Sequence, residues 1–184
     1  MNKYLSAAFG VIALVGGLSS VTTASFAARN YNVPTPALSA SMPWAVSAFC
    51  KHNAAECRGG GASVVAANAQ LITLLRRVNG RVNGAISYRA EPLDDWSINP
   101  RFGDCEDYAL SKRSALIKMG LPGSALRIGI TKTRRGEPHA VLVVMTDSGK
   151  LILDNRSGAV RELNQTEYRL QATSGRSLTT WVAG

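Results

Sequence analysis

The spacing of apolar residues changes halfway along this chain, and that change constrains the fold more than any other feature. In residues 62–78 and 104–119, apolar residues recur at the spacing of an amphipathic helix. Residues 125–131, 139–146 and 150–154 are instead rich in Val, Ile and Leu, as buried strands are. Helices that precede strands in this way are typical of an α+β domain.

Local signals indicate where these elements end. Ser63 is expected to cap the first helix, and the Asn-Gly pairs at 79–80 and 83–84 are expected to follow its last turn. Asp104 is expected to cap the second helix, which should end at Gly120-Leu121-Pro122. Asp147-Ser148-Gly149 predicts a tight turn that joins the last two apolar segments into a hairpin.

The N-terminus has the pattern of a secretory signal peptide over residues 1–27. Lys3 provides the positive region, residues 5–18 are apolar, and small residues precede a predicted cleavage after Ala27. An uncleaved anchor is the alternative, which we disfavour because the apolar run is shorter than the roughly 20 residues of a membrane span. We therefore expect a periplasmic or secreted protein with no membrane span after cleavage.

The remaining residues, 28–184, are expected to form a single domain. Their number, about 155, is the usual size of one domain and allows a full apolar core. Residues 28–40 are rich in Pro, Ser and Ala and are expected to be extended. Residues 42–49 are expected to form a short strand or turn, and a further short strand or turn is expected near residues 159–163.

The chain has three cysteines, an odd number for an exported protein. Cys50 and Cys57 are close in sequence, and an oxidising compartment favours a local disulfide between them. A metal site built from Cys50, His52 and Cys57 is the alternative, although no fourth ligand is visible nearby. Pairing Cys50 with Cys57 leaves Cys105 as a free and reactive thiol.

The formal net charge of +9 does not indicate nucleic-acid binding. The densest basic clusters, at residues 76–81 and 132–135, lack the interleaved aromatic residues of a nucleic-acid groove. We interpret them as solvated surface, which also suits an anionic envelope or an acidic substrate.

Cys105, His139 and Asp154 occur in the order nucleophile, base and orienting residue. Cys105 begins the second predicted helix, where the helix dipole favours a thiolate. His139 begins one strand of the predicted hairpin and Asp154 ends the other, so we expect their side chains to meet across the ladder.

Acidic residues surround the predicted nucleophile. Asp104, Glu106 and Asp107 suit the first turn of a helix, and capping alone would explain their presence. Three carboxylates beside a thiol, however, oppose its ionisation. A hard cation bound through oxygen ligands would relieve that opposition.

The chain resembles the bacterial transglutaminase-like cysteine proteinases. The resemblance rests on blocks that occur in order and cover most of the chain: Asn83–Tyr88, Asp95-Trp96, Gly103–Ala109, Lys112, Gly120-Leu121-Pro122, His139–Leu142 and Leu153-Asp154-Asn155. It implies a papain-like, transglutaminase-like α+β fold in which the nucleophile helix packs on an antiparallel sheet.

The resemblance also implies roles for individual residues. Cys105 would be the nucleophile, His139 the base and Asp154 the orienting residue. Asp104 and Glu106 would bind calcium, and Trp96 would line the active-site cleft, whereas Tyr108 is expected to belong to the core.

The best-understood members of this family are periplasmic, calcium-dependent proteases. They cut large surface adhesins near an Ala-Ala pair, and a membrane receptor sequesters them. This chain is shorter than those proteases and carries the Cys50–Cys57 segment. These differences concern the substrate and the receptor more than the three catalytic residues.

We therefore expect an exported cysteine peptidase that acts on a protein of the cell surface or envelope. A transglutaminase or amidase would use the same three residues with a different acceptor or substrate. A non-catalytic exported binding module is the alternative from another class, and the complete set of catalytic residues argues against it.

Overall fold

The computed structural model describes residues 40–91 and 94–184. The predicted signal peptide, residues 1–27, and nearly all of the expected extended stretch, residues 28–40, lie outside the described residues. Within the described ranges, no helix combines the length and the apolar character that crossing a bilayer requires.

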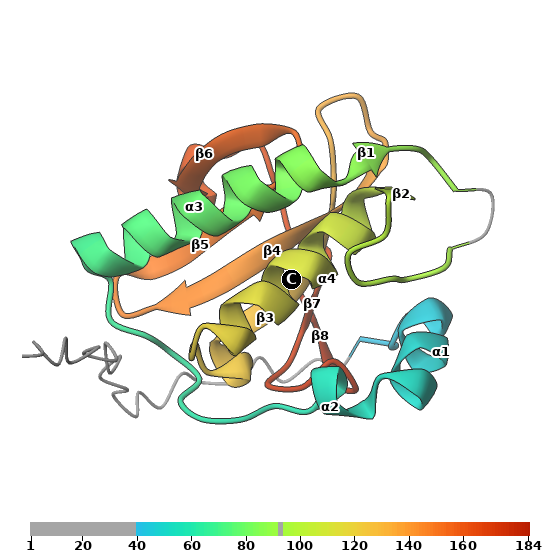
Figure 1. Ribbon diagram of the computed structural model, residues 1–184, viewed down its shortest axis with the longest axis horizontal. Helices are drawn as coiled ribbons and strands as arrows, with labels where there is room; N and C mark the ends of the chain where they lie inside the picture. The colour runs from blue at the N-terminus through green and yellow to red at the C-terminus, as the bar shows by residue number, and fades with distance from the viewer. Residues whose placement is uncertain (1–39, 92–93) are drawn as a thin grey trace, which may run out of the picture.

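The described residues form a layer of helices packed against one antiparallel sheet (Figure 1). The helices are α1 (Trp44–His52), α2 (Ala54–Cys57), α3 (Ala69–Ala85) and α4 (Cys105–Lys118), with 3-10 turns η1 (Gly123–Ala125) and η2 (Leu163–Gln165). The strands of the main sheet are β3 (Leu126–Lys132), β4 (Pro138–Thr146), β5 (Gly149–Asp154), β6 (Ser157–Glu162), β7 (Ala172–Ser174) and β8 (Trp181–Ala183). Their order is β6-β5-β4-β3-β7-β8, and β1 (Ser87–Tyr88) pairs in parallel with β2 (Phe102–Gly103) in a separate ladder.

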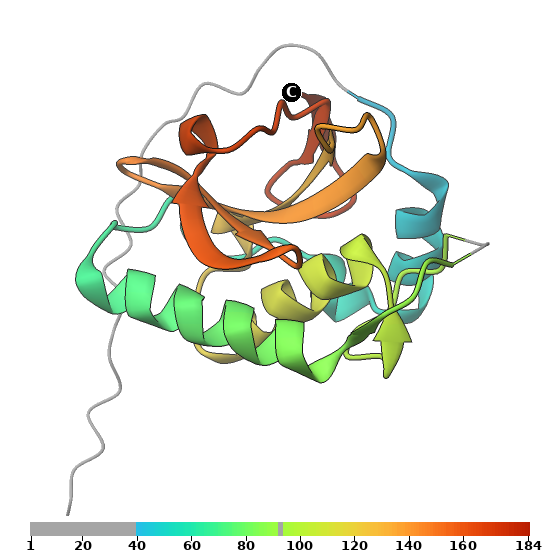
Figure 2. The ribbon, with the colours of Figure 1, turned by 90° about the horizontal axis from the view of Figure 1, so that it is seen from above.

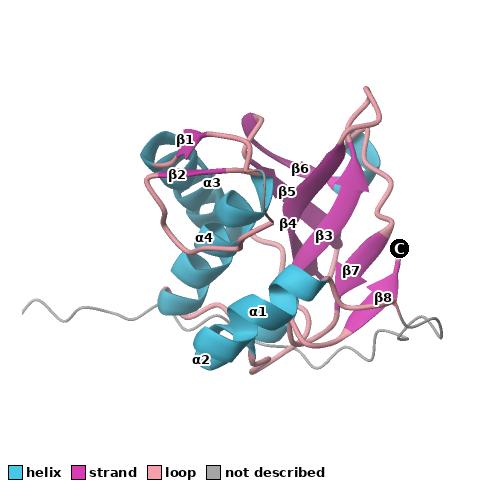
Figure 3. Ribbon diagram, turned by 90° about the vertical axis from the view of Figure 1, so that its right-hand side faces the viewer, coloured by secondary structure: helices cyan, strands magenta, loops and turns pink. Residues whose placement is uncertain are grey.

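Helices α3 and α4 cover the same face of the main sheet (Figures 2 and 3). Helix α4 packs mainly on β4, the most apolar strand, in which Val141, Leu142, Val143 and Val144 are all buried. Helix α3 packs beside α4 and over β6. The expected α+β class, with a helix that begins at Cys105 packed on an antiparallel sheet, is confirmed.

The second predicted helix and the hairpin were predicted correctly. Helix α4 begins directly after Asp104, whose backbone N–H donates to the Asp107 carboxylate at 3.2 Å. Gly120 follows the helix with a φ of 91°, a conformation that glycine adopts without strain. Strands β4 and β5 pair from Leu142–Leu153 to Thr146–Gly149, with Asp147 and Ser148 in the turn.

The first predicted helix was placed too early. It was expected over residues 62–78 with Ser63 as its cap, but α3 begins at Ala69 and is capped by Asn68, whose side chain accepts from the Leu71 N–H at 2.8 Å. The earlier residues join the sheet, because the Val65 N–H donates to the Met145 carbonyl at 3.0 Å. Apolar spacing alone did not separate that bridge from the helix that follows.

The Asn-Gly pairs at 79–80 and 83–84 lie inside α3 and do not end it. The Asn79 carboxamide donates to the Ser157 carbonyl at 2.8 Å, and the Asn83 carboxamide donates to the Asp154 carbonyl at 3.0 Å. These contacts hold the helix against the turn between β5 and β6. Tertiary hydrogen bonds therefore outweigh the low helix propensity of the two glycines.

Residues 42–49 are also corrected, because residues 44–52 form helix α1 where a short strand or turn was expected. Ala45, Val46 and Phe49 share one buried face, which is helical spacing over a single turn. Strands β7 and β8 were not predicted, since each spans three residues and has little apolar pattern of its own.

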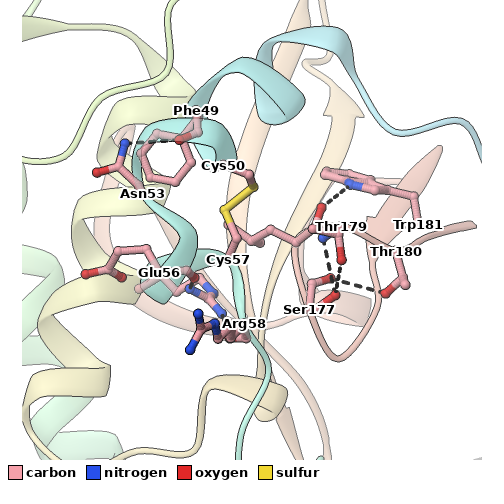
Figure 4. Close-up of a disulfide and its surroundings, with 12 residues drawn as sticks. Phe49, Cys50, Asn53, Glu56, Cys57, Arg58, Ser177, Thr179, Thr180 and Trp181 are labelled. Carbon is pink, nitrogen blue, oxygen red and sulfur yellow. Dashed lines mark hydrogen bonds between the residues drawn. A yellow bond between two sulfur atoms is a disulfide. The ribbon is translucent and has the colours of Figure 1, made fainter.

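The predicted disulfide joins α1 to α2, with Cys50 Sγ bonded to Cys57 Sγ (Figure 4). Because the bond uses both sulfurs, it excludes the alternative metal site with His52. The Cys57 carbonyl accepts from the Leu178 N–H at 3.0 Å, and Trp181 donates from Nε1 to the Leu178 carbonyl at 2.8 Å. The disulfide segment is thereby tied to the C-terminal strands.

Candidate active site

Cys105 is the first residue of α4 and lies beside strand β4. Its Sγ donates to Glu106 Oε2 at 3.0 Å, and the backbone of Ala140, the residue after His139, contributes a hydrogen bond that favours the thiolate. Cys105 is partly exposed, and within the described residues it is the one cysteine outside the disulfide. The α4–β4 packing therefore brings the free thiol next to the strand that carries the histidine.

His139 and Asp154 are in direct contact at the end of the hairpin. His139 Nε2 lies 2.9 Å from Asp154 Oδ1, and both side chains are nearly buried. The register that pairs Leu142 with Leu153 places His139 opposite the residues just beyond Asp154. The structure thus brings together the two residues that the turn spacing was expected to bring together.

Asp154 accepts hydrogen bonds on both carboxylate oxygens. Oδ1 accepts from His139 and from the Arg156 N–H at 3.0 Å, while Oδ2 accepts from the Tyr168 hydroxyl. Burial alone would raise the pKa of Asp154, but these donors outweigh it and lower the pKa to about 2. Asp154 is therefore an anion, and it can only accept hydrogen bonds from His139.

A cavity of about 460 Å³ opens over Cys105 and His139. Its other lining residues are Tyr88, Tyr108, Thr133, Glu137, Pro138, Asn155 and Arg156. A second cavity, of about 520 Å³, is lined by Asp154 and Tyr168 and also by Arg134, Arg156 and Arg161. Arg156 lines both cavities, so the two adjoin at the Asp154 end of the site.

The acids beside Cys105 form a compact group. One ligand atom each from Asp104, Cys105 and Glu106 lies within 4.8 Å of the others. Burial, together with hydrogen bonds to the carboxyls of Asp94 and Asp104, raises the pKa of Glu106 to about 9. These oxygen atoms form the kind of donor set that a hard cation prefers.

The same environment opposes ionisation of the thiol. Burial raises the pKa of the Cys105 thiol, and the charge and hydrogen bond of Glu106 add to that effect. Together they outweigh the helix dipole, which the sequence led us to expect would favour a thiolate.

Asp107 is separate from this group. It is completely buried and accepts from the Ser97 N–H at 2.7 Å and from the Asp104 N–H at 3.2 Å. Burial raises its pKa to about 7, although those two N–H donors lower it in part. Asp107 caps the helix and supports the loop before it, which is the structural role that we weighed for all three acids.

Trp96 belongs to the core and does not line the cavity over Cys105, contrary to the expectation of a cleft position. Its side chain is 5% exposed, and its Nε1 donates to Asp94 Oδ1 at 2.9 Å. Trp96 thereby holds Asp94 near Glu106. Tyr108, expected in the core, is buried and donates to the Ile86 carbonyl at 2.7 Å.

Sequence reasoning assigned no role to Asp94, Lys112 or Tyr168. Lys112 is 0% exposed, and its Nζ has no hydrogen-bond partner among the described residues. Burial lowers the pKa of Lys112 to about 7, partly opposed by the charge of Asp154. The position of Lys112 among the core positions of α4 could have indicated its burial. Nothing near Tyr168 in the sequence indicated its contact with Asp154.

Most of this chain matches one known protein family. The family described as bacterial transglutaminase-like cysteine proteinase BTLCP matches residues 37–183. No curated protein shows a significant match.

Three solved structures of LapG from Legionella pneumophila are similar at 24% identity. One LapG structure has a TM-score of 0.53, and the match covers 62% of this chain and 69% of that chain. An EGTA-treated structure has a TM-score of 0.51, with coverage of 62% and 68%. A calcium-bound structure has a TM-score of 0.48, and the match spans 56% of this chain and 64% of that chain. Similarity at this level shows the fold alone.

Proposed function

Because the chain belongs to the bacterial transglutaminase-like cysteine proteinase family, we propose that it is an exported cysteine peptidase that cleaves a protein substrate. The observation that carries this proposal is the 2.9 Å contact between His139 and Asp154 beside a cavity that also contains Cys105. A thiol, an imidazole and an orienting carboxylate are the groups that covalent amide hydrolysis requires.

In this mechanism His139 removes the proton from Cys105, and the sulfur attacks the carbonyl carbon of the scissile amide. The oxyanion that forms can accept from backbone N–H groups at the start of α4, which have no partner within the helix. His139 then gives the proton to the leaving amine, and a thioester remains on Cys105. Water, deprotonated by His139, hydrolyses the thioester, which releases the acid and restores the thiol.

We further propose calcium as the cofactor, held by Asp104 and Glu106 with Asp94 beside them. The raised pKa of Glu106 indicates that this carboxyl is held in its neutral form when no cation is bound. A bound cation would supply that charge and stabilise the start of α4. With the cation bound, the Glu106 carboxylate would coordinate it in place of the hydrogen bond that it now accepts from the Cys105 thiol.

Export is part of the same proposal. A disulfide between Cys50 and Cys57 is typical of an extracytoplasmic compartment, and the predicted signal peptide fits that location. Substrates would then be proteins of the cell envelope or surface. Transglutaminase or amidase chemistry would use the same atoms, but membership of a proteinase family supports hydrolysis of a polypeptide.

The test compares secreted and envelope proteins from cells that carry either the wild-type protein or Cys105→Ala. Mapping of new N-termini should find a fragment that only the wild type produces, and its precursor should accumulate with the variant. The purified wild-type protein should cut that precursor at the same bond, while His139→Ala should not. Identical sets of termini from the two strains would reject the peptidase assignment.

A further inference from the structure

We propose that Tyr168 is a positioning residue that fixes the Asp154 carboxylate and the His139 ring in their working orientation. The proposal rests on the catalytic roles proposed above for His139 and Asp154. It concerns a residue outside the three catalytic side chains, in the segment between η2 and β7.

Tyr168 contacts both members of the pair at once. Its hydroxyl donates to Asp154 Oδ2, while His139 bonds the other oxygen, Oδ1. Its ring lies against the His139 ring, with centroids 5.5 Å apart and planes tilted by 43°. Rotation of the carboxylate would break one of the two hydrogen bonds, and rotation of the imidazole would displace the tyrosine ring.

The backbone around Tyr168 is itself fixed on both sides. Its N–H donates to Thr166 Oγ1 at 3.2 Å, and Thr131 Oγ1 donates to the Arg169 carbonyl at 2.8 Å. The Gln171 N–H then donates to the Ile130 carbonyl at 2.8 Å. Strand β3 therefore holds the segment, so the tyrosine is positioned before any substrate arrives.

The ring of Tyr168, which packs against the His139 ring, also lines the second cavity, whereas His139 does not. Both Tyr168 and Asp154 line that cavity of about 520 Å³, whereas His139 lines the cavity over Cys105. Without the tyrosine ring, water from the second cavity would reach the contact between His139 and Asp154. Water there would compete for Asp154 and weaken the orientation of the imidazole.

The experiment compares Tyr168→Phe, which keeps the ring and removes the donor, with Tyr168→Leu, which removes both. One readout is the rate at which iodoacetamide alkylates Cys105 across pH. The second is the titration of the Asp154 carboxyl carbon by NMR, a signal that a purely structural role would leave unchanged. The other charged or titratable groups near Asp154, namely His139, Lys112 and Arg156, stay in place in both variants.

For Tyr168→Phe we expect the titration midpoint of Asp154 to rise by roughly one pH unit, because one donor to the carboxylate is lost. Alkylation of Cys105 should slow by about tenfold, and Tyr168→Leu should slow it further. Tyr108→Phe is the matched control, since it removes a buried tyrosine hydroxyl that bonds Ile86 and not Asp154. In Tyr108→Phe the titration midpoint of Asp154 should equal that of the wild type.

His139→Ala separates failure of this inference from failure of the proposed function. If His139→Ala alkylates as fast as the wild type, the catalytic roles are wrong. If His139→Ala is slow while Tyr168→Phe keeps both the wild-type rate and the wild-type Asp154 midpoint, the positioning role of Tyr168 is wrong and the catalytic roles stand.

Discussion

His139 Nε2 lies 2.9 Å from Asp154 Oδ1, and this contact determines which nitrogen of the imidazole can act as a base. The donors around Asp154 keep its pKa near 2, so the carboxylate accepts and the proton must lie on Nε2. Nδ1 is then the nitrogen that carries a free lone pair. The proposed catalytic roles follow from this assignment, because the base that activates Cys105 must be unprotonated.

Substitution of the three residues that we propose as catalytic should give a graded loss of activity. Cys105→Ala should abolish turnover, because it removes the atom that forms the thioester. His139→Ala should lower kcat by about 10²–10⁴-fold, the usual contribution of a general base. Asp154→Asn should lose less, because it removes orientation and charge but leaves the imidazole. Single-turnover rates on the identified substrate measure all three.

Circular dichroism of each variant provides the control for folding, and Cys105→Ala should match the wild type. An Asp154→Asn protein with the full wild-type rate would remove Asp154 from the catalytic group. Equal losses in His139→Ala and Asp154→Asn would show that the two residues act as a unit.

The disulfide makes a simple prediction about thiol content. Purified protein that is denatured without reductant should show one free thiol per chain, because Cys50 and Cys57 are bonded and Cys105 is not. Cys105→Ala should then show none, and reduction should reveal two thiols in that variant. Three free thiols in the wild type would contradict both the disulfide and the proposed export.

The accuracy of the sequence-based predictions depended on whether local signals or tertiary contacts determined each element. Helix α4 and the β4–β5 hairpin have a cap, a turn and a strong apolar pattern of their own, so their ends were predicted within one residue. Helix α3 is instead positioned by contacts of Asn79 and Asn83 with a turn more than 70 residues later. No local pattern contains that information.

The same distinction applies to the site. The approach of His139 to Asp154 follows from counting along a hairpin, which sequence alone permits. Tyr168 reaches Asp154 from a loop held by β3, and the burial of Lys112 depends on how α4 docks on the sheet. These features depend on the assembled fold, and reasoning from spacing did not assign them a role.

Lys112 should make stability depend on pH. Burial lowers its pKa to about 7 in the folded protein, whereas a lysine in the unfolded chain has a pKa of about 10.4. Between these values the unfolded chain binds more protons than the folded one, so this group makes the free energy of unfolding rise with pH, by at most about 1.4 kcal/mol per unit. Lys112→Met should be more stable than the wild type at pH 7, and that advantage should shrink by about 2 kcal/mol by pH 9.

Urea unfolding at pH 7, 8 and 9 measures this difference, and Lys118→Met is the matched control. Lys118 lies on the same helix but is exposed, so its replacement should give a difference from the wild type that is constant across these pH values. A constant difference for Lys112→Met as well would show that the buried ammonium does not titrate in this range.

Calcium should act on both the stability and the thiol. Chelation with EGTA should lower activity, and calcium should restore it and raise the melting temperature, because a ligand held at 100 times its Kd adds about 2.7 kcal/mol of stability. Calcium should also speed the alkylation of Cys105, since a bound cation adds positive charge beside the thiol and favours the thiolate.

Glu106→Gln is the clearest variant for this prediction, because Asp104 is also the N-cap of α4 and its loss would add a capping defect of about 1 kcal/mol. In Glu106→Gln, calcium should no longer raise the melting temperature. Alkylation of Cys105 in this variant should proceed at the same rate with and without calcium. Glu162→Gln removes a carboxylate from β6, far along the chain from this group, and should keep the wild-type response. If the wild-type protein were fully active in EGTA and showed no thermal shift with calcium, the acids beside Cys105 would serve only to cap the helix, and some other positive group would have to stabilise the thiolate.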